Sequence, residues 1–252
     1  MLRRISFSLA AASLLAAAPA SAQIFYALDN STITQNGVAG PNSVAKRNEF
    51  LSNLSGTVQT ETFEGLAVGT GNPALSFVGS GPTINAALSG NGTVQSACSS
   101  GSCPINYGFA DGSPRFFFLS TGTGNEFNIK FNQAVAAFGF DGSDISDSGS
   151  SFFIQFLLGG VALTGFNSPL NVTNSGSLAS SNQLFFGYIN TGGFDEVRVS
   201  SNGTGDFFGF DNLTVGDAQQ VVSSTVPEPS TYALMAAGLA GLLVVSRRRR
   251  VA

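Results

Sequence analysis

The chain has 252 residues, of which 43% are hydrophobic and only 10% are charged, and its formal net charge is −4. It contains no histidine, which excludes the commonest general base, the usual zinc ligand and every serine–histidine or cysteine–histidine pair. Catalysis is therefore not expected, although glycosidases that work with two carboxylates need no histidine.

The first 22 residues have the three parts of a secretory signal peptide. Arg3 and Arg4 form a basic region, Ile5 to Ala18 an apolar region, and Ala20-Ser21-Ala22 a small-residue cleavage site. We expect cleavage after Ala22, which makes Gln23 the N-terminus of the exported protein.

Between its two ends the chain is strongly acidic. Six of the 11 basic residues lie in the signal peptide or at the C-terminus, whereas 14 of the 15 acidic residues lie between them, so this central part carries a charge of −9. Such a charge repels phosphate backbones, and no nucleic acid is expected as a partner. It suits divalent cations, or simply solubility outside the cell.

Residues 23–56 are predicted to be a lead-in that contains one soluble helix. A strand is expected at Ile24 to Leu28 and the helix at Pro41 to Leu54, since proline is tolerated in a first helical turn. Gly56 suits the end of the helix. The residues expected to face a sheet are Val44, Arg47, Leu51 and Leu54, with Phe50 beside them.

Residues 57–217 are predicted to form an antiparallel β-sandwich, followed by a linker at 218–225. Short runs with a period of two alternate with Gly, Asn, Ser and Pro, as in Glu126 to Phe131, where apolar and polar residues take turns. Phenylalanine, with 23 copies, is expected to fill the core. The predicted strands are Val58–Phe63, Leu75–Val78, Thr93–Ala97, Arg115–Ser120, Glu126–Phe131, Val135–Phe140, Ser151–Leu158, Val161–Phe166, Leu184–Ile189, Phe194–Val199 and Phe207–Val215.

Cys98 and Cys103 are the two cysteines of the chain. In an exported protein, two cysteines at this spacing with a glycine between them favour a small disulfide loop. A redox role would call for Cys-x-x-Cys beside a βαβ pattern, which the sequence lacks.

Residues 226–252 have three parts in a fixed order. Pro227-Glu228-Pro229 is a stiff, extended tripeptide, and Ser230 to Ser246 is an uncharged helix of roughly 26 Å, slightly short for a hydrocarbon core of about 30 Å. A basic cluster then follows, which stays on the cytoplasmic side of a membrane. It consists of Arg247, Arg248, Arg249 and Arg250.

An ordinary C-terminal membrane anchor would account for the hydropathy alone. The composite of tripeptide, apolar helix and arginine cluster resembles the PEP-CTERM sorting signal of Gram-negative bacteria. The resemblance implies a membrane-embedded exosortase as partner, cleavage near Pro-Glu-Pro, and release or transfer to the cell surface after transient anchoring in the membrane.

The body looks like the jelly-roll β-sandwiches of carbohydrate-binding modules, which carry a Phe-Glu early and an Asp-Asn late in the chain. By that resemblance Glu64 and Asp211 would each give a carboxylate to a structural calcium ion, the one cofactor considered. The alternative is that both acids are solvent-facing edge residues. A weaker cation candidate is the loop with Asp141, Asp144 and Asp147, whose spacing does not fit an EF-hand.

We therefore expect an exported, non-catalytic structural or interaction protein of the cell surface or extracellular matrix. One alternative is an exopolysaccharide-binding module, whose mark would be an exposed Tyr26, Tyr107 or Tyr188. A second alternative is a carboxylate-based glycoside hydrolase. Acid pairs such as Asp195 and Glu196, or Glu61 and Glu64, do not favour it, because residues an odd number of positions apart in a regular strand point to opposite faces.

Overall fold

The computed structural model describes a β-rich body and four residues of the C-terminal segment. The chain divides into two compact units, Met1–Val221 and Val222–Ala252. The described residues are 22–30, 40–56, 58–96, 114–120, 126–145, 151–164, 170–171, 182–202, 207–222, 234–235 and 238–239.

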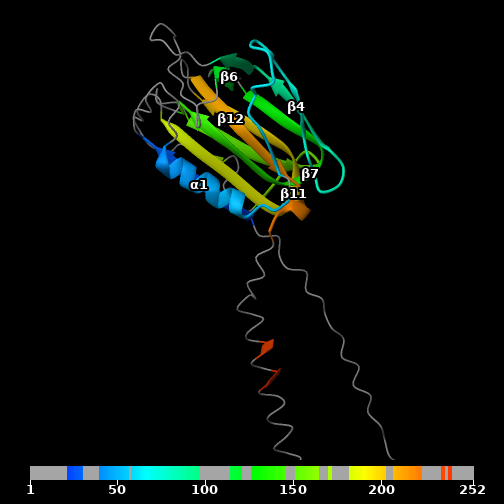
Figure 1. Ribbon diagram of the computed structural model, residues 1–252. Helices are drawn as coiled ribbons and strands as arrows, with labels where there is room; N and C mark the ends of the chain where they lie inside the picture. Colours follow the sequence, from blue (N-terminus) through cyan, green and yellow to red (C-terminus); the bar gives the residue numbers. More distant parts are fainter. Residues whose placement is uncertain are drawn as a thin grey trace, which may run out of the picture. The chain divides into compact units, whose positions relative to one another are not determined.

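One α-helix, one short 3-10 helix and twelve strands make up the described body, and all the strands belong to one antiparallel sheet that folds on itself (Figure 1). In chain order the elements are β1 (Ala22–Asp29), α1 (Pro41–Ser52), β2 (Gln59–Glu61), β3 (Ala74–Phe77), β4 (Ile84–Gly90), β5 (Thr93–Ser96), β6 (Arg115–Ser120), β7 (Glu126–Ser143), β8 (Ser151–Leu158), β9 (Val161–Ala162), β10 (Leu170–Asn171), β11 (Gln183–Asn202), β12 (Phe207–Gly216) and η1 (Ala218–Gln220).

The two longest strands, β7 and β11, run through both layers of a sandwich. In one layer they pair with each other over Ala137–Ser143 and Gln183–Ile189, with β1 and β12 on either side. In the other layer they pair again, now flanked by β4 and β8. The register shifts between Ile189 and Phe194 mark where β11 passes from one layer to the other.

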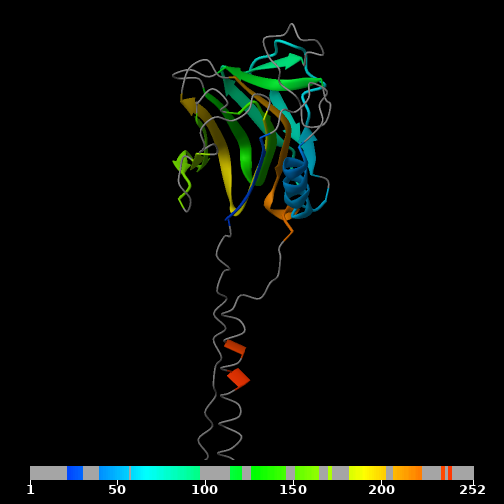
Figure 2. The ribbon, with the colours of Figure 1, turned by 90° about the vertical axis from the view of Figure 1, so that its left-hand side faces the viewer.

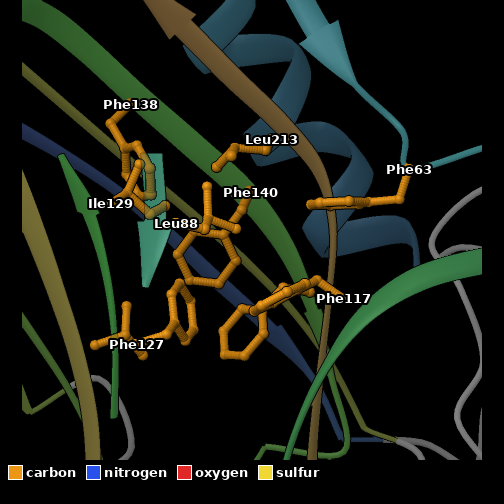
Figure 3. A pocket seen from close by; sticks show the side chains of 10 residues that line it. Phe63, Leu88, Phe117, Phe127, Ile129, Phe138, Phe140 and Leu213 are labelled. Carbon is orange, nitrogen blue, oxygen red and sulfur yellow. The ribbon is translucent and has the colours of Figure 1, made fainter. Parts of the chain in front are cut away.

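Phenylalanine rings from the two layers meet in the main core. Phe127 in one layer lies against Phe210 in the other with ring centroids 4.9 Å apart, and Phe138 faces Phe156 at 6.0 Å. Edge-to-face pairs of this kind add to the free energy gained by burial. A cavity of only about 10 Å³ is left in this core (Figure 3), at the lower limit of the space that one water molecule needs.

Helix α1 covers the outer side of the layer that contains β1 (Figure 2). Its fully buried Phe50 contacts Phe25 and Phe185, with ring centroids 5.5 and 5.6 Å away. The ring fits because the strands beneath it carry Gly139 and Gly187. A Cβ atom at these glycines would lie 2.8 and 2.7 Å from the ring.

The predicted fold class is confirmed, since the body is an antiparallel β-sheet protein with one soluble helix. The helix ends at Ser52 rather than Leu54. Its most buried residues are Ser43 and Phe50. Each lies one position before a residue of the predicted stripe, Val44 or Leu51, so the face toward the sheet is shifted by one residue. The buried Ser43 hydroxyl donates to the backbone oxygen of Gln183, so it keeps a hydrogen-bond partner inside the protein.

The strand predictions were wrong in five places. The runs predicted as Glu126–Phe131 and Val135–Phe140 are one strand, as are those predicted as Leu184–Ile189 and Phe194–Val199. Strands β4 and β10 were not predicted, and of the strand predicted at Val161–Phe166 the described residues are in strand at Val161–Ala162 and not at 163–164. The lead-in strand spans Ala22–Asp29 and belongs to the main sheet.

Candidate functional site

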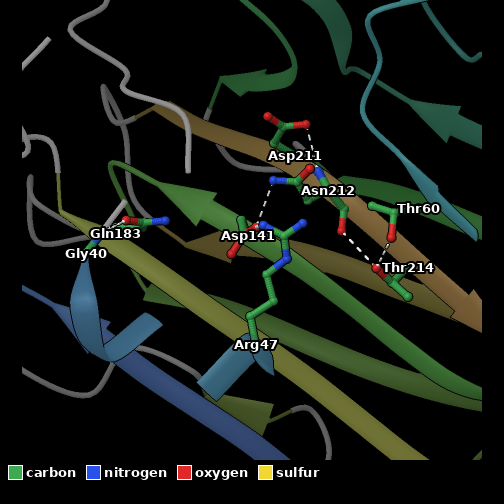
Figure 4. Close-up of polar contacts among 8 residues, drawn as sticks. All are labelled: Gly40, Arg47, Thr60, Asp141, Gln183, Asp211, Asn212 and Thr214. Carbon is green, nitrogen blue, oxygen red and sulfur yellow. Dashed lines mark hydrogen bonds and ion pairs between the residues drawn. The ribbon is translucent and has the colours of Figure 1, made fainter. Parts of the chain in front are cut away.

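A polar network lies between α1 and the sheet, and it begins at the first turn of the helix. Gly40 occupies the N-cap position and has no side chain to offer, so Asp29 from β1 takes over this role. Its carboxylate accepts from the backbone N–H groups of Ser43 at 2.7 Å and Asn42 at 3.2 Å. The Oε1 atom of Gln183 accepts from the Gly40 N–H (Figure 4).

Two buried acidic residues lie on neighbouring strands farther along the helix. Asp141 of β7 and Asp211 of β12 are direct cross-strand partners, and each is 3% exposed. Arg47 extends from α1 toward the sheet, with Nη1 3.2 Å from Asp141 Oδ2, and Asn212 Nδ2 donates to the same oxygen at 2.9 Å (Figure 4). The guanidinium thus compensates the charge of the buried Asp141 carboxylate.

Strand β12 is irregular at Asn212. Its φ of 51° is left-handed, which asparagine tolerates, and the pairing with β7 shifts register between Asp211 and Thr214. Below the bulge, β12 changes partner from β6 to β2, where the hydroxyls of Thr60 and Thr214 are 2.8 Å apart. The amide oxygen of Asn212 is buried and has no hydrogen-bond partner.

The residues of the predicted calcium sites make contacts within the protein. Glu64 Oε1 accepts from the Arg115 N–H at 2.7 Å, and Arg115 Nη1 donates to the Glu64 backbone oxygen. Asp211 lies opposite Asp141 in the pairing of β12 with β7. Asp144 follows the end of β7 with a φ of 58°, and Asp147 lies outside the described residues.

Within the described ranges, no three Asp, Glu, Cys or His side chains are gathered to hold a metal ion. A structural calcium therefore stays a prediction. So does the disulfide, since Cys98 and Cys103 lie outside the described part of the chain.

The carboxylates considered for hydrolysis make local hydrogen bonds. Asp195 accepts from the Gly159 N–H at 3.0 Å, and Glu196 Oε1 pairs with Arg198 Nε at 2.6 Å. Glu61 Oε1 accepts from the Phe63 N–H at 2.6 Å, two residues ahead in the chain. Each of these acids thus stabilises a turn or a strand.

The candidate tyrosines differ in accessibility. Tyr188 is buried in the core against Phe156, whereas Tyr26 is 39% exposed. Burial raises the pKa of both phenols, and for Tyr188 a hydrogen bond with Asn190 lowers it in part. Tyr26 borders an open groove of about 560 Å³ between β1 and α1. Tyr107 lies outside the described residues.

Asp217 directly follows β12 and is the N-cap residue of η1. Its carboxylate accepts from the N–H and hydroxyl groups of Ser80 and from the N–H groups of Gln219 and Gln220. Burial alone would raise the pKa of Asp217, but these hydrogen bonds outweigh it and hold the pKa below the ordinary value of 3.8.

The structural roles of Asp29, Arg47 and Asp217 were not predicted from the sequence. The role of Asp217 could have been predicted, because Asp-x-x-Gln is a capping-box pattern and the structure forms this box between Asp217 and Gln220. Asp29 and Arg47 carried none, because their partners come from other elements of the fold.

Most of the predicted membrane helix lies outside the described residues, as do Pro227, Glu228, Pro229 and the four terminal arginines. No helix within the described ranges is long and apolar enough to cross a membrane.

Comparison with known proteins gives a match to a family model and weak likenesses to solved structures, one of which is described here, and no curated protein matches. The structure is the enzymatically active domain of bacteriophage CBA120 tailspike protein 4, at 13% identity and a TM-score of 0.28. The match covers 53% of this chain and 19% of that one, so it spans about a fifth of the tailspike chain. A score this low does not indicate a shared fold.

The family match is to the PEP-CTERM protein-sorting motif, over residues 225–250. It agrees with the predicted order of tripeptide, apolar run and arginine cluster. The chain thus carries a PEP-CTERM sorting signal behind a β-sandwich body and is an exosortase substrate sorted to the cell exterior.

Proposed function

We propose that the exported body is a non-catalytic structural or interaction protein of the cell surface or extracellular matrix. This proposal is supported by the hydrogen bonds and ion pairs that the carboxylates of the body make. Glu61, Glu64, Asp195 and Glu196 each accept a hydrogen bond from a nearby backbone amide or arginine, and Asp141 is paired with Arg47. Acids committed to such contacts are poorly placed as a general acid and a nucleophile.

The test compares binding with turnover on one sample. The exported protein is incubated with exopolysaccharide extracted from its own cells, and co-sedimentation and newly released reducing ends are both measured. We expect association with the matrix fraction and no release of reducing ends. Release that disappears in Asp195→Asn or Glu196→Gln would instead establish a carboxylate-based hydrolase.

A second candidate function is recognition of exopolysaccharide by the body itself. The exposure of Tyr26 beside an open groove favours it, because aromatic rings with a polar edge are suited to stacking against sugars. A glycan array would give a binding signal that is lost in Tyr26→Ala and retained in Tyr26→Phe. The absence of any signal would leave the structural role.

A further inference from the structure

Strand β1 forms a long edge of the sheet. It pairs with β11 over all eight of its residues without a register shift, and it pairs with no other described strand. Ile24 and Tyr26, on one face of the strand, are 44% and 39% exposed. Edge strands are normally protected by lysine, proline, a bulge or short length, and β1 has none of these protections.

A groove follows this edge. Its strand side is formed by three consecutive residues, Tyr26, Ala27 and Leu28, so the groove runs along the edge of β1 rather than over one face. Its other side is a single stripe of α1. The stripe consists of Asn42, Ala45, Lys46 and Glu49. The groove thus combines a strand edge with a helical wall, which is the shape that suits an added strand.

We propose that this groove receives β1 of a second copy of the chain, so that two sheets join edge to edge around a two-fold axis. The charges of the wall suit this occupant. Lys46 and Glu49 form an ion pair at 2.6 Å, and a two-fold axis across the groove brings each of them toward the opposite charge of the other copy. From Gln23 to Leu28 the strand is uncharged, so self-pairing sets no like charges against each other.

The expected cleavage after Ala22 defines the centre of the pair. The strand then spans Gln23 to Asp29, and its middle residue, Tyr26, lies opposite its own copy in a fully paired antiparallel register. The joined edge would place the exposed parts of Ile24 and Tyr26 in the interface. The inference rests on the proposed function, since it names the partner that a structural surface protein would assemble with.

The test uses charge reversal at that central residue. Molar mass of the exported protein is measured by light scattering across a concentration series, for the wild type, Tyr26→Lys and Tyr26→Glu. We expect a wild-type dimer, and dissociation constants at least about tenfold higher for each variant alone, because like charges then face each other. A mixture of the two variants should regain the dimer. The matched control is Val161→Lys, at a side chain 71% exposed on β9.

Three results would overturn the inference: a wild-type protein that stays monomeric, variants that dimerise unchanged, or a mixture that fails to recover. A monomer that loses exopolysaccharide binding in Tyr26→Lys would assign the groove to a glycan instead. Association with the matrix fraction is scored separately. A monomer that still associates contradicts the dimer alone, whereas a dimer that does not associate contradicts the proposed function alone.

Discussion

Asp29 shows how a single side chain joins two elements of this fold. It sits on β1, is 4% exposed, and completes the first turn of α1 through the N–H groups of Asn42 and Ser43. The helix N-cap, Gly40, supplies no side chain. The start of the helix therefore depends on a carboxylate that reaches it from the sheet.

Asp29→Ala should lower the free energy of unfolding by about 2 kcal/mol, because two helix N–H groups lose their acceptor in a buried place. Urea denaturation of the exported protein measures this. Asp195→Ala is the control, since Asp195 also accepts a backbone N–H but at an exposed turn. Equal losses in the two variants would contradict the capping role of Asp29.

Asp217 should make the free energy of unfolding depend on pH, with lower stability in acid. Its pKa in the folded protein is below 3.8, so folding favours the ionised form. The contribution is therefore fully present above the pKa of the unfolded chain and is lost as the pH falls through the folded pKa. Asp217→Asn should flatten the acid limb of a plot of unfolding free energy against pH. An unchanged acid limb in that variant would refute the assignment.

At the scale of elements, helix α1 packs closely on the sheet because two glycines of the sheet leave room for a ring of the helix. Phe50 occupies the space that Cβ atoms at Gly139 and Gly187 would need. A methyl group there forces the ring or the helix to move, while removing the ring leaves a cavity. The helix and the two glycines are thus one packing unit.

Gly187→Ala should destabilise the protein by about 1–3 kcal/mol, and Phe50→Ala by about 3–5 kcal/mol. In the Phe50→Ala background the glycine change should cost much less, because the atoms it would meet are gone. A double-mutant cycle by urea denaturation measures this coupling. Gly65→Ala, with no atom within 4 Å of its Cβ position, is the control. Additive effects of the two changes would exclude the contact.

Periodicity predicted the strands and their antiparallel class, but not where the long strands continue. Asn132 to Ala134 and Asn190 to Gly193 have the composition of turns, and this composition predicts two separate strands where β7 and β11 each continue. In the folded protein they lie where strands pass between layers, with a register shift in the pairing. Continuation across a bulge depends on pairing with distant strands, which local composition does not encode.

The candidate site was less predictable than the fold. Asp141 and Asp211 were both singled out as cation ligands, but in separate sites, and the register of β7 against β12 makes them partners. Arg47 was expected to pack on the sheet, and it is an ion-pair partner of Asp141 instead. Such pairings depend on tertiary register, and one sequence alone does not fix it.

For the whole molecule, the two ends and the body have separate roles. The C-terminal motif determines that the chain is sorted to the exterior, and the body determines what arrives there. The non-catalytic role proposed for the body rests on the lack of histidine in the sequence and on the local hydrogen bonds of its carboxylates.

Replacing Pro227 and Pro229 by alanine should block processing, because the tripeptide, predicted to be extended, becomes able to continue the helix predicted after it. We expect the variant to accumulate uncut in the membrane fraction, as seen by fractionation and immunoblotting. Pro82→Ala, an exposed proline of the body, serves as the control and should be processed normally. Normal release of the double variant would show that the tripeptide is not needed.

The most direct test of the account is the intact mass of the native protein in each cell fraction. We expect a cell-surface or extracellular species that begins at Gln23 and lacks the segment after Pro229. A full-length protein, uncut at both ends and confined to the cytoplasm, would contradict it.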